Sequence, residues 1–566
     1  MTLLTRGRIV LVAGLAFSLL VLVGWMGIDH FYATTRLVPA NGGEYVEGIV
    51  GRPVAINPIL AVSDADRDIC SLVFSGLTRI DDQGVLSPDL ARTWEISADS
   101  LTYTFHLRDD VLWHDGEPLR ADDVVFTIGL LQSPEFQGPV TLRNNWLGVS
   151  VQELDALTVV FTLQDPYAPF IESTTIGILP RHKLENVAVS ALADDLFNRE
   201  PVGTGPFRFS AITHAEDVVE SVVLEANTAY YEKIPYLERV RFRFFDESQS
   251  MITALRQHSI EGIHLVTPDM LSEVEAIRNL TIMRSSIPRY QAVFFNTQGK
   301  AFLQDPAVRQ ALSLSIDRQA VIEQAVGGQA TIADGPLTSA SWAYTATADP
   351  VLFDLELART RLSESGWVDE DEDGILEKDG EKLAFKLLSD DAPERVQAAI
   401  LIADMWKQVG VNVEVRLFGV GTFIDEYLRK RDFDAVLFGQ SLSWDPDIYA
   451  YWHSTQVTDP GLNISAYSNQ KVDKLLEDAR RLTRAEDRQK KYAEIQNIIR
   501  ADVPAVFLYV PEYVYAVRDS VHDVRPVTLF RPSDRLKDIV RWYEQEKRVK
   551  ISVEKSPSID DPSTLL

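Results

Sequence analysis

Residues 101–127 have the sequence "LTYTFHLRDDVLWHDGEPLRADDVVFT", and this stretch decides the fold class. Tyr103, Phe105 and Leu107 alternate with polar residues, which is typical of a strand with one buried face. The "HDGE" that follows is a turn signal and predicts a second strand. Residues 121–132 then carry acidic side chains where the first turn of a helix favours them. Two strands followed by a helix predict a fold that contains both β-strands and α-helices.

The rest of the chain repeats this mixture. A strand pattern at 44–50 and a hairpin pattern at 151–163 precede a helix–glycine–strand pattern at 391–418. Residues 471–482 place apolar side chains on one face of a predicted helix, namely Val472, Leu475, Leu476 and Ala479. Helix–strand units together with antiparallel strands predict an α/β fold with more than one sheet.

Length and charge restrict the possible functions. A chain of 566 residues is too long for one compact core, so we expect two to four domains. Its 55 basic and 83 acidic residues give a net charge of −28. This excess argues against a nucleic-acid partner, because lysine and arginine must offset phosphate charge. Cys70 is the only cysteine, so we expect no internal disulfide.

The N-terminal region predicts a membrane segment. Arg6 and Arg8 precede residues 9–28, which carry no charge. As a helix, these residues match a hydrocarbon core of about 30 Å, and the arginines place the rest of the chain outside the cytoplasm. A cleaved signal peptide is the alternative, although its apolar region usually has only about 7–15 residues. A buried hydrophobic helix is the third interpretation. Residues 29–43 form a short polar linker.

A search for catalytic motifs finds none in the sequence. It contains no GxxxxGK[ST], HExxH, CxxC or GxSxG pattern. "GTGPF" at 203–207 lacks the third glycine of a dinucleotide fingerprint and predicts a turn. His258 and His264 are six residues apart and would lie on different faces of a helix, which does not suit a metal pair. We therefore expect neither a cofactor nor an enzyme.

One acidic stretch resembles a calcium loop. In "DEDEDGILE", residues 369–377, Asp369, Asp371 and Asp373 follow the first part of an EF-hand loop. The twelfth position is Gly380, where a bidentate glutamate is required. An acidic turn and a weak calcium site both stay open.

A second stretch concentrates aromatic rings. Residues 441–454 are "SLSWDPDIYAYWHS", in which Asp445 and Pro446 predict a helix start. The rings suit the wall of a ligand pocket, packing between lobes or, least well, a catalytic site. The candidate ligand-binding residues are Trp444, Asp445, Asp447, Tyr449, Trp452 and His453, together with Tyr290, Asn296 and Trp342.

Several stretches together resemble one family. They are "LVFSGLTRIDDQGVLSPDLARTWEIS", the opening stretch, "PVGTGPFRF", "VRQALSLSIDRQAVIEQAVGG" and "YSNQKVDKLLEDARRLTRAEDRQKKYAEIQNIIRADVPAVFLY". In this order, from about residue 44 to 545, they resemble the large extracytoplasmic solute-binding proteins of ABC importers, in the oligopeptide- and dipeptide-binding family. The resemblance implies a periplasmic-binding-protein-like fold, with two main lobes joined by a hinge and an inserted third lobe.

The resemblance also implies how the chain is divided. We expect a cytoplasmic stub (1–8), a transmembrane anchor or signal segment (9–28), a linker (29–43), lobe I in three parts (44–80, 205–288 and 505–545), an inserted lobe II (81–204), lobe III (289–504) and a flexible tail (546–566). In such proteins the ligand lies between lobes I and III, which close about a hinge.

Two departures from the family matter. Many exported members carry a lipid-attachment cysteine after the signal, and this chain has none there, which favours a protein anchor. Peptide-binding relatives hold the peptide α-ammonium with an aspartate near residue 442, where this chain has Leu442 or Ser443. Asp445 or Asp447 would have to replace that aspartate, unless both carboxylates serve a helix start.

The function implied by the resemblance is capture of an oligopeptide-like solute and its delivery to ABC permease subunits, without catalysis. We expect a monomer at the outer face of the cytoplasmic membrane, anchored through residues 9–28. One alternative is an anchored binder of a non-peptide solute, such as an oligosaccharide or a metal complex. Another is an extracytoplasmic receptor or chaperone without import.

Overall fold

The computed structural model describes residues 34–215, 218–346 and 352–550, with a few positions between 17 and 32. The predicted membrane segment 9–28 lies largely outside the described residues, and so does most of the predicted tail 546–566. Among the described residues, none of the helices combines the length and the apolar composition that crossing a bilayer requires.

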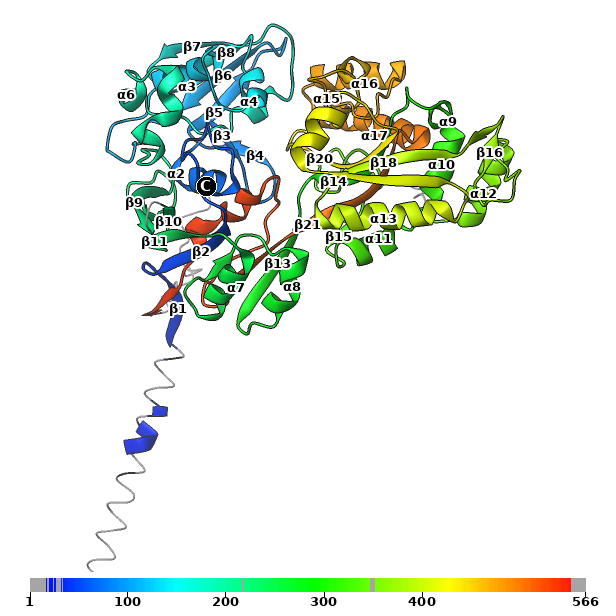
Figure 1. Cartoon of the computed structure of the whole chain (residues 1–566). Coiled ribbons are helices and arrows are strands. Elements are labelled where there is room, and N and C mark those ends of the chain that lie inside the picture. Colours follow the sequence, from blue (N-terminus) through cyan, green and yellow to red (C-terminus); the bar gives the residue numbers. More distant parts are fainter. Residues whose placement is uncertain are drawn as a thin grey trace, which may run out of the picture.

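One large sheet runs through both halves of the molecule (Figure 1). Its main path is β19-β18-β20-β14-β21-β12-β2-β11-β10-β9, and β13 and β15 pair with β21 beside this path. The strands are β2 (Glu44–Val50), β9 (Phe207–Ala215), β10 (Val218–Ala226), β11 (Arg239–Phe245), β12 (Gly262–Ile263), β13 (Leu280–Ser286), β14 (Arg289–Phe295), β15 (Ala330–Ile332), β18 (Ala384–Asp390), β19 (Asn412–Phe418), β20 (Ala435–Ser441) and β21 (Ala505–Arg518).

β21 joins the two halves. Its first residues, up to Tyr509, pair with β14, and its last residues, from Glu512, pair with β13. Only residues 287 and 288 separate β13 from β14, so two neighbouring chain segments cross between the halves together. The change of partner falls inside β21, after the boundary predicted at residue 505, because one continuous strand serves both halves.

In the half that contains β14, β18, β19 and β20, a separate apolar core lies on each face of the sheet. On one face are α9 (Ala301–Gln304), α10 (Pro306–Leu314), α11 (Arg318–Ala325), α12 (Leu355–Glu364) and α13 (Pro393–Lys407). On the other are η3 (Phe423–Leu428), α15 (Tyr449–Trp452), α16 (Gln470–Arg481) and α17 (Ala485–Asp502). The predicted apolar face of 471–482 is confirmed, because all four of its side chains are buried.

The other half contains β2 and a smaller four-stranded sheet. That sheet has the order β5-β6-β8-β7, with β5 (Ala91–Ile96), β6 (Thr102–Leu107), β7 (Ser150–Asp155) and β8 (Thr158–Thr162). Tyr103, Phe105 and Leu107 are buried in β6, which confirms the alternation. In place of the predicted second strand there is a single bridge between Leu112 and Pro118, next to a tight turn in which the Trp113 amide donates to the Glu117 carbonyl at 2.8 Å.

Helices and short elements complete this half. They are α2 (Asp64–Val73), β3 (Thr78–Ile80), β4 (Leu86–Pro88), α3 (Ala121–Gln132), α4 (Val140–Asn144), α5 (Phe170–Ser173), α6 (Arg181–Leu184), η1 (Val189–Asp194), η2 (Leu196–Asn198), α7 (Ser248–Arg256) and α8 (Pro268–Glu275). The C-terminal segment adds η5 (Pro532–Leu536) and η6 (Ile539–Arg541) to this half. The short elements elsewhere are β16 (Glu377–Lys378), β17 (Glu381–Lys382), α14 (Val420–Thr422) and η4 (Ser454–Gln456). The predicted α/β class with more than one sheet is confirmed.

A buried ion cluster ties the C-terminal segment to this half. Arg535 is fully buried and donates to both carboxylate oxygens of Asp68, at 2.9 and 2.6 Å. It also donates to Glu47 at 3.1 Å. Residues 47 and 535 lie near opposite ends of the chain, so the cluster holds the N-terminal and C-terminal segments together in this half.

The two ends of the described chain pair with each other. β1 (Thr35–Ala40) is antiparallel to β22 (Gln545–Lys550). β1 lies within the predicted linker 29–43, and β22 overlaps the start of the predicted tail 546–566. Part of both segments is therefore ordered as a two-stranded ribbon.

Candidate functional site

The carboxyl ends of β18, β19 and β20 meet at one edge of their sheet, because β18 is parallel to both neighbours. β14 is antiparallel to β20 and begins at the same edge, where Arg289 pairs with Ser441. Loops at the carboxyl ends of parallel strands are where open α/β sheets bind ligands. We call this the carboxyl edge. The aromatic stretch 441–454 begins there because it follows β20.

Asp445 does not begin a helix, so the prediction from Asp445 and Pro446 is wrong. α15 begins at Tyr449. The Asp445 carboxylate instead accepts two hydrogen bonds of 2.6 Å from the guanidinium of Arg488 on α17, and both side chains are almost fully buried. Burial raises the pKa of Asp445, and Arg488 opposes that rise. A carboxylate held in this way is not free to bind a ligand ammonium.

Asp447 is also paired. One of its oxygens accepts a hydrogen bond of 2.9 Å from Nε of Arg480 on α16, and a second guanidinium nitrogen of Arg480 lies 2.8 Å from the same oxygen. Its other oxygen accepts from the Tyr449 amide at 3.2 Å, so Asp447 does serve the start of α15. The Arg480 guanidinium lies 3.8 Å from the centre of the Tyr449 ring, which adds a cation–π contact. Both acidic residues of the aromatic stretch therefore have cationic partners.

The loop after β20 and α16 contact residues 84, 168 and 172, which lie in the segment predicted to be an inserted lobe. The Glu172 carboxylate accepts from the backbone amides of Trp444 and Asp445 at 3.2 and 3.1 Å. The Trp444 indole donates to the Gly84 carbonyl at 2.8 Å, and the Ala168 amide donates to the Arg480 carbonyl at 2.7 Å. Figure 1 shows α15 and α16 beside this part of the chain. These bonds join two bodies that have separate cores.

Glu172 has an unusual environment for an acid. Burial raises the pKa of its carboxyl to about 7. The Asp445 amide lowers the pKa, the Asp445 carboxylate raises it, and Arg531 and the Trp444 amide lower it. Because this pKa lies near neutrality, we expect the contact between the two bodies to change with pH.

The structure places the other candidate residues in different surroundings. Tyr290 and Trp452 are buried in the core between the sheet and α15–α17. His453 is buried, stacks on Tyr449 at 4.1 Å and is bonded to Thr455. Trp342 is half-buried, with the Arg488 guanidinium 5.3 Å from its ring centre. Asn296 bonds the carbonyls of residues 431 and 433 at the edge opposite to the carboxyl edge.

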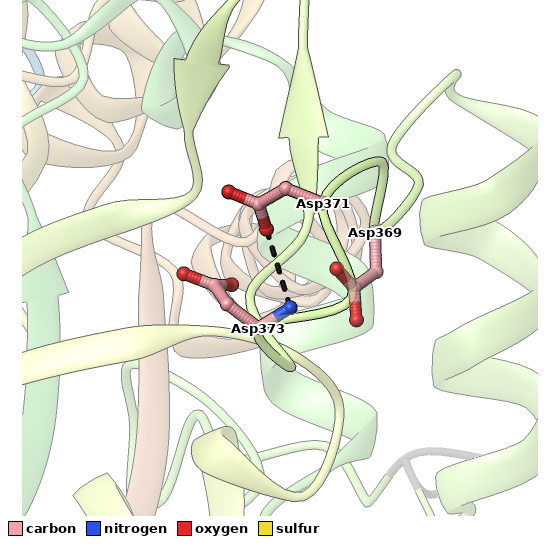
Figure 2. Close-up of side chains that lie close together, drawn as sticks. All are labelled: Asp369, Asp371 and Asp373. Atoms are coloured by element: carbon pink, nitrogen blue, oxygen red, sulfur yellow. Dashed lines mark hydrogen bonds between the residues drawn. The ribbon is translucent and has the colours of Figure 1, made fainter.

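In the acidic stretch 369–377, for which an acidic turn and a weak calcium site are the two interpretations, the carboxylates have a lysine as neighbour. Figure 2 shows Asp369, Asp371 and Asp373 around the loop, and their carboxylate oxygens lie within 4.8 Å of one another. The Lys382 ammonium of β17 lies 3.1 Å from Asp371 and also pairs with Asp373. These carboxylates raise the pKa of Lys382. A resident ammonium therefore supplies the positive charge that a calcium ion would bring.

Sequence reasoning missed Glu172, Arg289, Arg395 and Tyr509. Arg395 lies in the first turn of α13, where the helix dipole disfavours a cation. Arg289 directly precedes the buried residues of β14. Two signals in the sequence were available: the unfavourable helix position of Arg395 and the place of Arg289 at the start of a buried strand.

Comparison with known proteins identifies the family. Residues 85–461 match the family described as bacterial extracellular solute-binding proteins, family 5 middle. The chain is 30% identical over 512 residues to the oligopeptide-binding protein AppA of Bacillus subtilis (strain 168), which covers 89% of this chain and 92% of AppA.

Two solved structures agree with this match. The structure of AppA from Bacillus subtilis in complex with a nonapeptide has a TM-score of 0.69 at 30% identity, covering 89% of this chain and 99% of that one. NikZ from Campylobacter jejuni in complex with Ni(L-His) has a TM-score of 0.71 at 29% identity, covering 88% and 99%. The chain therefore belongs to family 5 of the bacterial extracellular solute-binding proteins.

Proposed function

We propose that the chain captures a peptide outside the cytoplasm and delivers it to the permease subunits of an ABC importer. Membership of family 5 supports solute binding outside the cytoplasm, and AppA and its nonapeptide complex support a peptide as the solute. A protein with this function binds its solute and does not transform it, so the chain is a binding protein and not an enzyme.

We further propose the predicted division into lobe I (44–80, 205–288 and 505–545), lobe II (81–204) and lobe III (289–504). The observation that carries a closing mechanism is a set of hydrogen bonds: Glu172 and Gly84 accept from Trp444 in the loop after β20, and Ala168 donates to Arg480 of α16. The two crossing segments, 286–289 and 509–512, act as the hinge, since they are the chain segments that pass from one half to the other: the link between β13 and β14, and the middle of β21.

Residues 9–28 anchor the protein to the outer face of the membrane in this proposal, and the protein works as a monomer. An uncharged stretch of membrane length with arginines at positions 6 and 8 supports the anchor. N-terminal analysis of protein from the native membrane tests it. A soluble mature chain that begins near residue 34 would reject the anchor.

Native mass spectrometry of protein purified without added ligand tests the solute class. We expect a released mass that fragments as a peptide. A released metal complex would instead support the second candidate, a binder of small metal complexes, which the similarity to NikZ favours. Release of an unrelated compound only would reject both.

A further inference from the structure

Two polar groups at the carboxyl edge lack a protein partner. The Tyr509 side chain is 1% exposed, and its hydroxyl has no hydrogen-bond partner. Arg289 is exposed at the first residue of β14, and among the described residues no acceptor lies within hydrogen-bonding distance of its guanidinium. A buried hydroxyl without a partner costs about 1–3 kcal/mol, so a solute group that pairs with it would recover this free energy.

Strand register brings these groups to one face of the sheet. Gln291 of β14 pairs with Tyr509 of β21. Arg289 lies two residues before Gln291, so it projects from the same face and is the diagonal neighbour of Tyr509, a relation that spans about 7–8 Å. The Gln291 amide between them is also buried, with an oxygen that has no donor.

The charges around Arg289 leave it without a committed anion. Arg395 is the nearest cationic neighbour, but it is bonded to Asp390 at 2.6 Å and to Glu394 at 3.3 Å. Asp64, from α2 in the other half, acts on Arg289 electrostatically but pairs with Arg67 at 3.1 Å. Asp390, Glu394 and Asp64 are therefore each paired with another arginine, and within the described part of the chain Arg289 has no acidic side chain as an ion-pair partner.

The surroundings of Arg289 are crowded although its side chain reaches water. Burial lowers the pKa of Arg289, Arg395 lowers it further, and Glu394, Tyr509 and Asp64 oppose this effect. Burial also raises the pKa of Tyr509 to about 12, so at neutral pH its hydroxyl is a hydrogen-bond donor. A guanidinium and a neutral hydroxyl together suit an anion that can accept two hydrogen bonds.

We propose that Arg289 and the Tyr509 hydroxyl bind a carboxylate of the solute beside the hinge, and that recognition does not require a charged α-amino group. This inference rests on the proposed peptide-binding function and names the solute class: a peptide or peptide-like acid with a free carboxylate, whose amino end can be blocked. The second part follows from the loop after β20, where Asp445 and Asp447 already pair with Arg488 and Arg480.

A library of short peptides tests the inference on the full-length protein. Each sequence is present in free, N-acetylated and C-terminally amidated form, and retained peptides are counted by native mass spectrometry. We expect the free and acetylated forms to bind alike, and the amides to bind about 10- to 100-fold more weakly, as for loss of a hydrogen bond to a charged group.

Three variants connect the preference to the named residues. Arg289→Gln and Tyr509→Phe should reduce the preference for free carboxylates. Arg256→Gln removes the same charge from an exposed pair between Arg256 on α7 and Glu273 on α8, and should leave the preference unchanged. Equal binding of amides and acids, loss of binding on acetylation, or an unchanged preference in Arg289→Gln would each overturn the inference. Retention of no peptide in any form would reject the proposed function itself, and the inference with it.

Discussion

Replacement of Asp445 by asparagine distinguishes a structural acid from a ligand-binding one. Asp445 and Arg488 form two charge-assisted hydrogen bonds of 2.6 Å, with 2% and 6% of the side chains exposed. The variant removes the negative charge but keeps one acceptor, the amide oxygen at position 445, beside the Ala479 carbonyl and the Tyr492 hydroxyl at 3.1 and 3.2 Å. Breaking a buried pair costs about 3–5 kcal/mol, and these remaining partners place our expectation near 3 kcal/mol.

Hydrogen exchange measures this cost locally, which matters because a chain with several cores does not unfold in one step. We expect the opening free energy of the α17 amides to fall by about 3 kcal/mol in Asp445→Asn and in Arg488→Met. The double variant should lose at least about 2 kcal/mol less than the sum of both, since each single change leaves the other charge unpaired. Asp425→Asn is the matched control, because Asp425 and Arg429 form an exposed pair worth less than about 1 kcal/mol.

Binding supplies the refuting result. In Asp445→Asn, the ratio of affinities for free and N-acetylated peptides should not change. If the variant keeps its stability within about 1 kcal/mol but loses discrimination between these peptides, Asp445 binds the ligand ammonium and the structural interpretation is wrong.

Three further predictions follow from the charged clusters. In the contact between lobes II and III, the pKa of Glu172 rises from 4.5 to about 7, so closing favours the protonated carboxyl. The contact should therefore be strongest below about pH 4.5 and should weaken by up to about 3 kcal/mol as the pH rises to 7. Small-angle scattering between pH 5 and 8 should show the lobes opening, and the same opening in Glu172→Gln would exclude Glu172 as the cause. Arg535→Met leaves Asp68 and Glu47 buried without a cation and should lower the opening free energy of the α2 amides, measured by hydrogen exchange, by about 3–5 kcal/mol. Arg525→Met, in an exposed pair, should change it little. Calorimetric titration should detect no calcium binding by the native protein and weak binding, with a Kd near 10⁻⁴–10⁻³ M, by Lys382→Gln; tight binding by the native protein would show that a calcium ion displaces the lysine.

Local patterns predicted much of the fold. Alternation of Tyr103, Phe105 and Leu107 predicted β6, and the spacing of Val472 and Leu476 predicted the buried face of α16. These patterns work because a strand or a helix repeats its buried face every few residues. The order of the family motifs then predicted the family, which the comparisons confirm.

The candidate site was less accessible to sequence reasoning, because its contacts join distant residues. Asp445 has the favoured sequence of a helix start, but its partner Arg488 lies 43 residues later on another helix. The bond between Glu172 and the Trp444 amide spans 272 residues. Strand register alone brings Arg289 near Tyr509. Local propensity cannot specify such pairs, and in Asp445 a buried arginine prevailed over helix capping.

The central claim is that solute binding closes lobe III against the rest of the protein. Spin labels at Leu154→Cys on β7 and Leu462→Cys after α15 measure this directly, since both positions are exposed and the native Cys70 is buried. With a peptide shown by native mass spectrometry to be bound, we predict that the distance distribution shifts toward one short distance, that of the form in which Glu172 accepts the amides of Trp444 and Asp445. An identical distribution with and without the bound peptide would contradict closure.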